Sequence, residues 1–181
     1  MFKPYKRAVP GAAPGAPAEG ESPPKYSALF LLDKVKQADQ IKQIQDVMAE
    51  LLRKPDGTPG RLPADKLCLR DGDDKDEPEF NGHMMLSASN ATKPSLVLGY
   101  KDAAGHFARV EDNDPRIFSG CYFNVAVRLW FQSNTYGKRV NCELSSVQYL
   151  RPGVALGNVQ VSPESVFEEI DQEGGDINDL L

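Results

Sequence analysis

A run with strict two-residue periodicity, residues 121–132, constrains the fold of this chain more than any other segment. Its odd-numbered positions are all apolar, as expected for a β-strand with one face toward a hydrophobic core. These positions hold Cys121, Phe123, Val125, Val127, Leu129 and Phe131, and the even-numbered positions hold Tyr122, Asn124, Ala126, Arg128, Trp130 and Gln132. We therefore expect a half-buried strand whose second face presents two aromatic rings, an arginine and two amides.

A second alternating run follows after a short segment that is rich in turn-forming residues. Its apolar positions are Val140, Cys142 and Leu144, and Gly137 stands in the turn between the two runs. Two such runs with a glycine-containing connection predict a β-hairpin. After Ser145 the apolar positions shift by one residue, which predicts a β-bulge near Ser145 and Ser146.

Aromatic and cationic side chains that share one strand face are typical of proteins that bind single-stranded nucleic acid. Unpaired bases stack on such rings at roughly 1–3 kcal/mol each, and cations contact phosphates. The candidate contacts are Tyr122, Trp130 and Tyr136 for bases, Arg128, Lys138 and Arg139 for phosphates, and Lys34, Lys93 and Arg116 as further cations. The alternative is that the rings pack beneath another element, and a one-residue change of register would exchange the two faces.

The rest of the chain predicts further short strands and one helix. Apolar residues at helical spacing predict a helix over about 37–54, after a strand at 25–32. The members of this apolar stripe are Val35, Ala38, Ile41, Ile44, Met48 and Leu51. Short strands are expected near 67–70, 82–88, 95–100 and 107–110. Five or six short strands with one helix are typical of a small mainly β barrel.

Composition divides the chain into three parts. Residues 1–24 are rich in Pro, Ala and Gly and predict a flexible arm, residues 25–157 form the folded domain, and residues 158–181 form an acidic tail. The net charge of −5 seems unsuited to a nucleic-acid binder, but seven acids and no base lie from Glu164 onward. Without these seven acids, 21 bases stand against 19 acids. Because a charged surface acts locally, the overall charge does not exclude an anionic ligand.

Catalytic and metal-binding motifs are not found in the sequence. Three cysteines without CxxC spacing and two histidines in separate segments predict neither a zinc site nor a disulfide framework. The acidic segment 71–79 does not fit an EF-hand, because Lys75 and Asp76 replace the expected residues. We expect no enzyme, no metal and no cofactor, and neither a signal peptide nor a membrane-spanning segment. A metal-dependent nuclease that uses residues 71–76 is the weakest alternative.

Seven short segments together carry a family resemblance. They are Tyr26-Ser-Ala with Lys34 after it, Leu69-Arg-Asp-Gly-Asp, Pro78-Glu-Phe-Asn-Gly-His, Ser-Ala-Ser before Lys93-Pro, Phe118-Ser-Gly-Cys-Tyr-Phe-Asn, Asn134-Thr-Tyr-Gly-Lys-Arg and Ser146-Val-Gln-Tyr-Leu-Arg-Pro-Gly. Over about residues 25–157 the chain resembles the OB-fold single-stranded-DNA-binding proteins of tailed bacteriophages and prophages. The resemblance implies a five-stranded OB barrel with a sequence-tolerant cleft for single-stranded DNA. It also implies a role in phage DNA replication, recombination or repair in the cytoplasm of the infected bacterial host.

The acidic tail ends in a mixed acidic and apolar tip, Asp176, Ile177, Asp179, Leu180 and Leu181. It resembles the tails of bacterial and phage single-strand binders, which implies that it recruits replication or recombination proteins and competes with DNA for the basic cleft. The alternative function is a protein-interaction adaptor that binds no nucleic acid. A homodimer is left open, and no membrane partner is expected.

Overall fold

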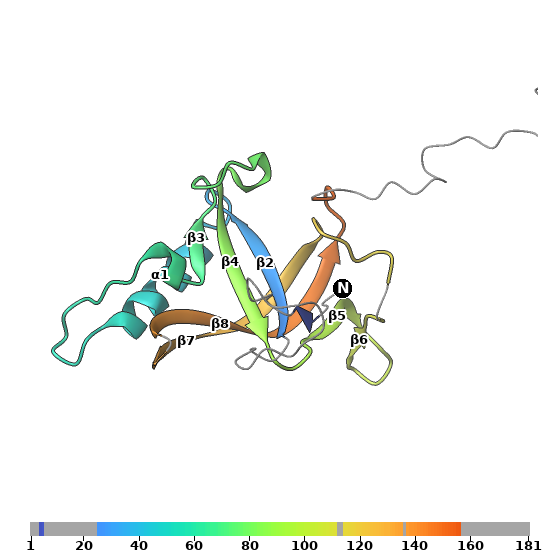
Figure 1. Cartoon of the computed structure of the whole chain (residues 1–181). Coiled ribbons are helices and arrows are strands. Elements are labelled where there is room, and N and C mark those ends of the chain that lie inside the picture. The colour runs from blue at the N-terminus through green and yellow to red at the C-terminus, as the bar shows by residue number, and fades with distance from the viewer. Residues whose placement is uncertain (1–3, 6–24, 112–113, 136, 157–181) are drawn as a thin grey trace, which may run out of the picture.

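The computed structural model describes residues 4–5, 25–111, 114–135 and 137–156, and it confirms a mainly β fold (Figure 1). Its strands are β1 (Pro4–Tyr5), β2 (Lys25–Asp33), β3 (Leu69–Asp71), β4 (His83–Asn90), β5 (Ser95–Lys101), β6 (Phe107–Arg109), β7 (Tyr122–Asn134) and β8 (Gly137–Arg151). The helix α1 (Ala38–Leu52) follows the first long strand, as predicted, and two short 3-10 turns lie at Ala64–Lys66 and Pro78–Phe80.

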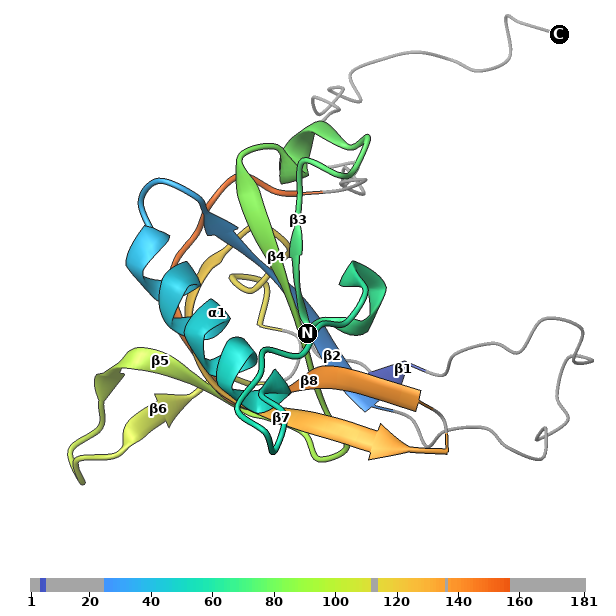
Figure 2. The ribbon, with the colours of Figure 1, turned by 90° about the vertical axis from the view of Figure 1, so that its left-hand side faces the viewer.

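All eight strands belong to one sheet, in the order β1-β2-β4-β8-β5-β6, with β3 paired to β4 and β7 paired to β8. This path ends at β6 without returning to β1, so the expected barrel is not closed among the described strands. The sheet is instead open and strongly twisted (Figures 1 and 2). The two residues of β1 pair with Lys25 and Tyr26, so this part of the expected flexible arm is a strand. The rest of the arm and the acidic tail lie outside the described residues.

Strand β8 has β7 along one edge and both β4 and β5 along the other. The two parallel contacts pair Ser89 with Glu143 and Ser95 with Ser146, and the β4–β5 connection lies between them. Asn90 spans this gap, because its Nδ2 donates to the carbonyl of Leu144 at 2.9 Å. The longest strand of the fold is therefore held along both edges.

The hydrophobic core lies between α1 and the sheet. Ile41 and Met48 are the buried residues of the helix and belong to one cluster with the buried side chains Cys68, Leu69, Leu86, Ala88, Val140, Cys142, Leu144 and Val147. Figure 2 shows α1 lying across the sheet. The predicted helical stripe is confirmed from Ile41 to Leu51, but Val35 precedes the helix and is 85% exposed.

The predicted hairpin is confirmed as β7–β8, and the predicted bulge is found at Ser145. Ala126 pairs with Ser146 and Val127 with Leu144, so Ser145 is the extra residue. Phe123, Val125, Val127 and Leu129 pack against the core as expected. The placement of Phe131 in the core is wrong, because its side chain stays 36% exposed although its cross-strand partner Val140 is buried in the core. Cys121 is likewise only half-buried, whereas Cys142 is buried.

Candidate nucleic-acid interface

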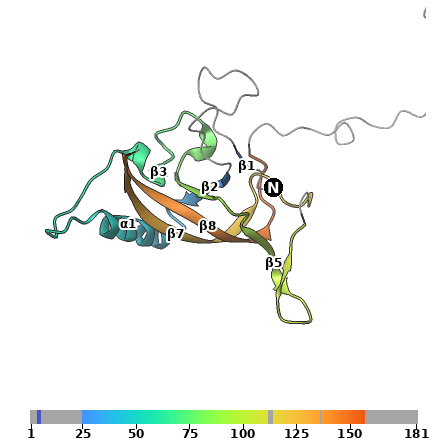
Figure 3. The ribbon, with the colours of Figure 1, turned by 60° about the horizontal axis from the view of Figure 1, so that its bottom comes forward.

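The outer face of the β7–β8 hairpin carries the predicted aromatic and cationic side chains. Residues directly opposite each other in an antiparallel pair point to the same side of the sheet. Six such pairs form this face: Tyr122 with Arg151, Asn124 with Gln148, Ala126 with Ser146, Arg128 with Glu143, Trp130 with Asn141, and Gln132 with Arg139. We call these six pairs the β7–β8 ribbon. It runs for about 33 Å from Tyr122 to Gln132 at the usual strand rise, and Figure 3 shows the two strands side by side.

Trp130 is the base-stacking candidate that lies toward the hairpin turn of the ribbon. It is 41% exposed although the neighbouring Leu129 packs into the core, so the predicted register is confirmed. Beside it, Asn141 Nδ2 donates to Gln132 Oε1 at 2.9 Å, which fixes the amides around the ring. A partly exposed indole in this position offers surface to an unpaired base.

Arg128 lies two residues before Trp130 and is held by Glu143. Its Nη2 and Nε donate to Glu143 Oε2 at 2.5 and 3.2 Å, and the arginine side chain remains 73% exposed. Such an exposed pair contributes little to stability, about 0–1 kcal/mol, but it directs the guanidinium across the ribbon toward β8. A guanidinium has five N–H donors, so further donors remain for a phosphate.

Tyr122, at the other end of the ribbon, already carries a cation on its ring. The guanidinium carbon of Arg151 lies 3.6 Å from the ring centroid, a cation–π contact. The ring edge is close to Gly153, where a Cβ would lie 2.9 Å from Tyr122 Cε2 and 2.2 Å from the Gly120 carbonyl oxygen. Tyr122 is still 49% exposed. This end of the ribbon therefore presents an arginine–tyrosine stack, and Arg151 is a candidate residue that sequence reasoning missed.

The cations of the hairpin tip divide between the two faces. Arg139 pairs with Gln132 and so belongs to the ribbon, whereas Lys138 pairs with Ser133 on the opposite side. The structure therefore does not bring Lys138 to the Trp130 face. Tyr136 lies outside the described residues.

Lys93 is exposed in the β4–β5 connection, between the two contacts that β4 and β5 make with the edge of β8. This position brings it close to the edge of the ribbon. Arg116 lies in the loop before β7 and is bound to Asp114, with Nη2 to Oδ2 at 2.6 Å and Nε to Oδ1 at 2.9 Å. These bonds lower the pKa of Asp114 and raise the pKa of Arg116.

Lys34 forms ion pairs with carboxylates of the acidic segment 71–79 and does not belong to the ribbon. Its Nζ lies 2.5 Å from Asp71 Oδ1 and 2.6 Å from Asp73 Oδ2, and we call these three residues the Lys34 clamp. The hydrogen bonds from Lys34 are the main cause that lowers the pKa of both carboxyls. Lys34 also follows the end of β2 that is remote from the contact between β4 and β8. The structure thus separates Lys34 from the other candidates.

The outer face continues from the ribbon onto the neighbouring strands. Glu143 pairs with Ser89 of β4, and Gln148 pairs with Val97 of β5, so these residues share the face of the ribbon. On β4 the same face includes Ser87, which accepts a hydrogen bond from Arg70 Nη2 at 3.2 Å. Arg70 was not predicted as a contact, because a three-residue strand is too short to show alternation.

Metal ligands do not cluster in the described part of the chain: no group of three or more His, Cys, Asp or Glu side chains could hold an ion. Within the same residues, no helix has the length and apolar character needed to cross a membrane. The ribbon offers rings, amides and guanidinium groups on one strand face. These are the chemical features of a surface for single-stranded nucleic acid.

Comparison with known proteins identifies the family. The family model of the Enterobacter phage Enc34 ssDNA-binding protein matches residues 13–177, which is most of the chain. The chain therefore belongs to the family of the Enc34 ssDNA-binding protein.

Individual relatives agree with this assignment. The protein p50 of Acyrthosiphon pisum secondary endosymbiont phage 1 is 30% identical over 164 residues, covering 83% of this chain and 82% of that protein. The single-stranded DNA-binding protein of bacteriophage Enc34, solved in complex with ssDNA, superposes with a TM-score of 0.64. It is 26% identical, with 86% of this chain and 81% of that chain covered. The same phage protein in a second structure gives a TM-score of 0.62 at 25% identity, with 81% and 80% covered.

Proposed function

We propose that this protein binds single-stranded DNA in a sequence-tolerant manner through the β7–β8 ribbon. The observation that carries the proposal is the exposure of Trp130, Arg128 and Tyr122 on one strand face in a member of this phage family. A homologous protein of phage Enc34 has been solved in complex with ssDNA, which supports the same ligand for this chain. Stacking on rings and contacts to phosphates need no particular base sequence.

The biological role that follows is protection of single-stranded DNA during phage DNA replication, recombination or repair. The protein acts in this proposal without catalysis, inside the infected bacterial cell, where phage DNA is exposed. Since it coats a strand instead of reacting with it, no cofactor takes part.

The acidic tail has a second part in the proposal, as a recruiter of partner proteins and as a competitor for the DNA-binding surface. Leu156 N donates to the carbonyl of Ser119 at 2.9 Å, so the tail starts beside the Tyr122 end of the ribbon. Fully extended, residues 157–181 span at most about 85 Å, more than the length of the ribbon. Seven acids on this tether are therefore within reach of Arg128, Arg139 and Arg151.

Fluorescence anisotropy of labelled oligo-dT, set against a duplex of equal length, tests the proposal. The measurement is made at low and high salt, with the full chain and with a chain that ends at Pro163. We expect salt-sensitive binding that prefers the single strand and becomes tighter when the seven acids are removed, because phosphate contacts release counterions. Absence of binding by both chains at low salt would leave the adaptor function as the better explanation.

A further inference from the structure

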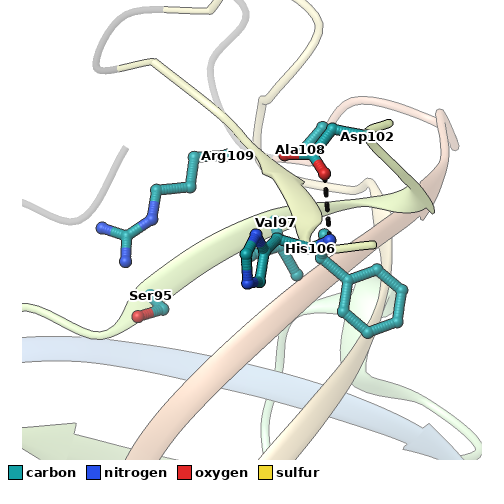
Figure 4. Close-up of a pocket in the computed structure, with 7 residues that line it drawn as sticks. Ser95, Val97, Asp102, His106, Ala108 and Arg109 are labelled. Carbon is teal, nitrogen blue, oxygen red and sulfur yellow. Dashed lines mark hydrogen bonds between the residues drawn. The ribbon is translucent and has the colours of Figure 1, made fainter. Parts of the chain in front are cut away.

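A half-open pocket of about 580 Å³, called the cavity below, lies where β5 and β6 form a hairpin that projects from the sheet (Figures 1 and 4). This volume is within the usual range of small-molecule sites, roughly 300–1,000 Å³. Ser95 and Val97 of β5 line one side, and His106, Phe107 and Arg109 line the other. Figure 4 shows the His106 ring beside Val97, with Arg109 and Ser95 to one side.

Hydrogen bonds between the Asp102 carboxylate and backbone N–H groups, together with one backbone–backbone hydrogen bond, hold the turn between β5 and β6. Asp102 Oδ1 accepts hydrogen bonds from the backbone N–H of Ala104 at 2.9 Å and of His106 at 3.0 Å. The Asp102 N–H in turn donates to the carbonyl of His106 at 2.8 Å. The single carboxylate of the cavity lining is therefore engaged by the backbone of the turn, and these bonds fix the backbone of His106.

The chemistry of the cavity matches a nucleotide. Phe107 is 45% exposed, and Lys101 Nζ lies 5.3 Å from the centroid of its ring. Arg109 is exposed at the rim and, among the described ion pairs, has no carboxylate partner. Within the lining, an aromatic ring and an imidazole offer faces to a base and Arg109 offers a cation to a phosphate, while Lys101 lies beside the Phe107 ring outside the lining.

The position of the cavity connects it with the ribbon. Arg109 pairs with Val97, Val97 with Gln148, and Gln148 with Asn124, which makes one row across β6, β5, β8 and β7. Asn124 Nδ2 donates to Gln148 Oε1 at 3.1 Å within this row. Three strand spacings of about 4.8 Å place the Arg109 backbone roughly 14 Å from that of Asn124. The cavity therefore opens on the face of the ribbon and within a few nucleotides of it.

We propose that the β5–β6 cavity holds one nucleotide of the DNA strand that lies on the β7–β8 ribbon. Arg109 contacts the phosphate of this nucleotide, while His106 and Phe107 contact its base. Gln148 and Asn124 line the path between the two sites with hydrogen-bonding amides. This inference rests on the proposed function, and it assigns the β5–β6 hairpin as a second, separate part of the DNA-binding surface.

The test compares the full chain with the variants Arg109→Gln and Phe107→Ala on oligo-dT of about 6 and about 16 nucleotides, lengths that span the usual site sizes. Both residues are exposed, and thermal unfolding checks that the variants fold. We expect a loss of affinity of about fivefold or more with the long oligonucleotide and a clearly smaller loss with the short one. Arg109→Gln should also make the slope of log affinity against log salt shallower by about 0.7, whereas Phe107→Ala should leave it unchanged.

Arg53→Gln is the matched control, because it removes the same charge at the end of α1, where Arg53 pairs with Glu50. If the full chain binds the long oligonucleotide and both cavity variants bind it as Arg53→Gln does, the cavity proposal is refuted while the proposed function stands. An equal loss with both lengths refutes it too. If the full chain binds neither oligonucleotide, the proposed function itself fails. Crosslinking of iododeoxyuridine oligonucleotides provides a second readout: adducts on His106 or Phe107 support the proposal, and adducts confined to the ribbon contradict it.

Discussion

Replacement of Trp130 by alanine isolates the contribution of stacking to DNA binding. The ring is 41% exposed on the ribbon and is not part of the buried core, so its removal should change binding far more than folding. Loss of one stacked base costs roughly 1–3 kcal/mol, which converts to a fall in affinity of about 5- to 140-fold. Anisotropy of labelled oligo-dT at fixed salt measures this change directly.

The chain offers a sharp control and a second signal for this experiment. Phe131 is the next residue of β7, is 36% exposed and points to the opposite face, so Phe131→Ala should keep the affinity within about twofold, less than one stacked base contributes. Trp130 is the one tryptophan of the sequence, and its emission therefore reports on the ribbon alone. Unchanged emission on saturation with oligo-dT, together with equal affinities for Trp130→Ala and Phe131→Ala, would refute the assignment of Trp130 to the DNA-binding face.

Three further predictions concern the Arg128–Glu143 ion pair, the close packing at Gly153 and the Lys34 clamp. Glu143→Gln should tighten DNA binding several-fold because it releases Arg128 for phosphate, and weaker binding in anisotropy titrations would contradict this role. Gly153→Ala should destabilise the fold by about 1–3 kcal/mol, since its Cβ would lie 2.2 Å from a backbone oxygen; an unchanged urea midpoint would refute this close packing. The Lys34 clamp lowers the pKa of two carboxyls, so the stability it provides is present above their ordinary pKa and is lost as pH falls through the lowered values. Melting temperatures of Lys34→Met should accordingly fall less between about pH 5 and pH 2 than those of the unchanged chain, and parallel curves would argue against the clamp.

The alternation of β7 predicted which of its side chains point to the outer face of the sheet. Apolar residues at every second position can satisfy only one register on a half-buried strand, so Tyr122, Arg128 and Trp130 had to share the outer face. The same argument failed for Phe131, because alternation gives the direction of a side chain but not whether other side chains cover it; Phe131 is exposed although its partner Val140 is buried. The bulge at Ser145 was also visible in the sequence, since the apolar positions shift there by one residue, whereas the second register shift, at Leu150, was not predicted.

Contacts between strands that are distant in sequence could not be predicted in this way. The position of Val97 beside Gln148 depends on a parallel pairing between β5 and β8 that no local pattern encodes. The ion pairs of Lys34 with Asp71 and Asp73 join side chains 37 and 39 residues apart in the sequence. Lys34 was predicted as a DNA contact from its charge alone, and no local pattern showed that it pairs with these carboxylates instead. The closed barrel was inferred from strand number, and strand number does not determine whether the edges of a sheet meet.

The stack of Arg151 on Tyr122 has a consequence for the direction of a bound strand. One end of the ribbon offers a guanidinium lying on a phenol ring, and the region near the other end offers the face of an indole. DNA also has two chemically different ends, so its two orientations on the ribbon place different sugars and phosphates against Arg151. These two complexes are not equivalent by symmetry, and each 1.4 kcal/mol between them corresponds to a tenfold preference. A surface that tolerates any base sequence is in this way still able to impose a 5′-to-3′ polarity.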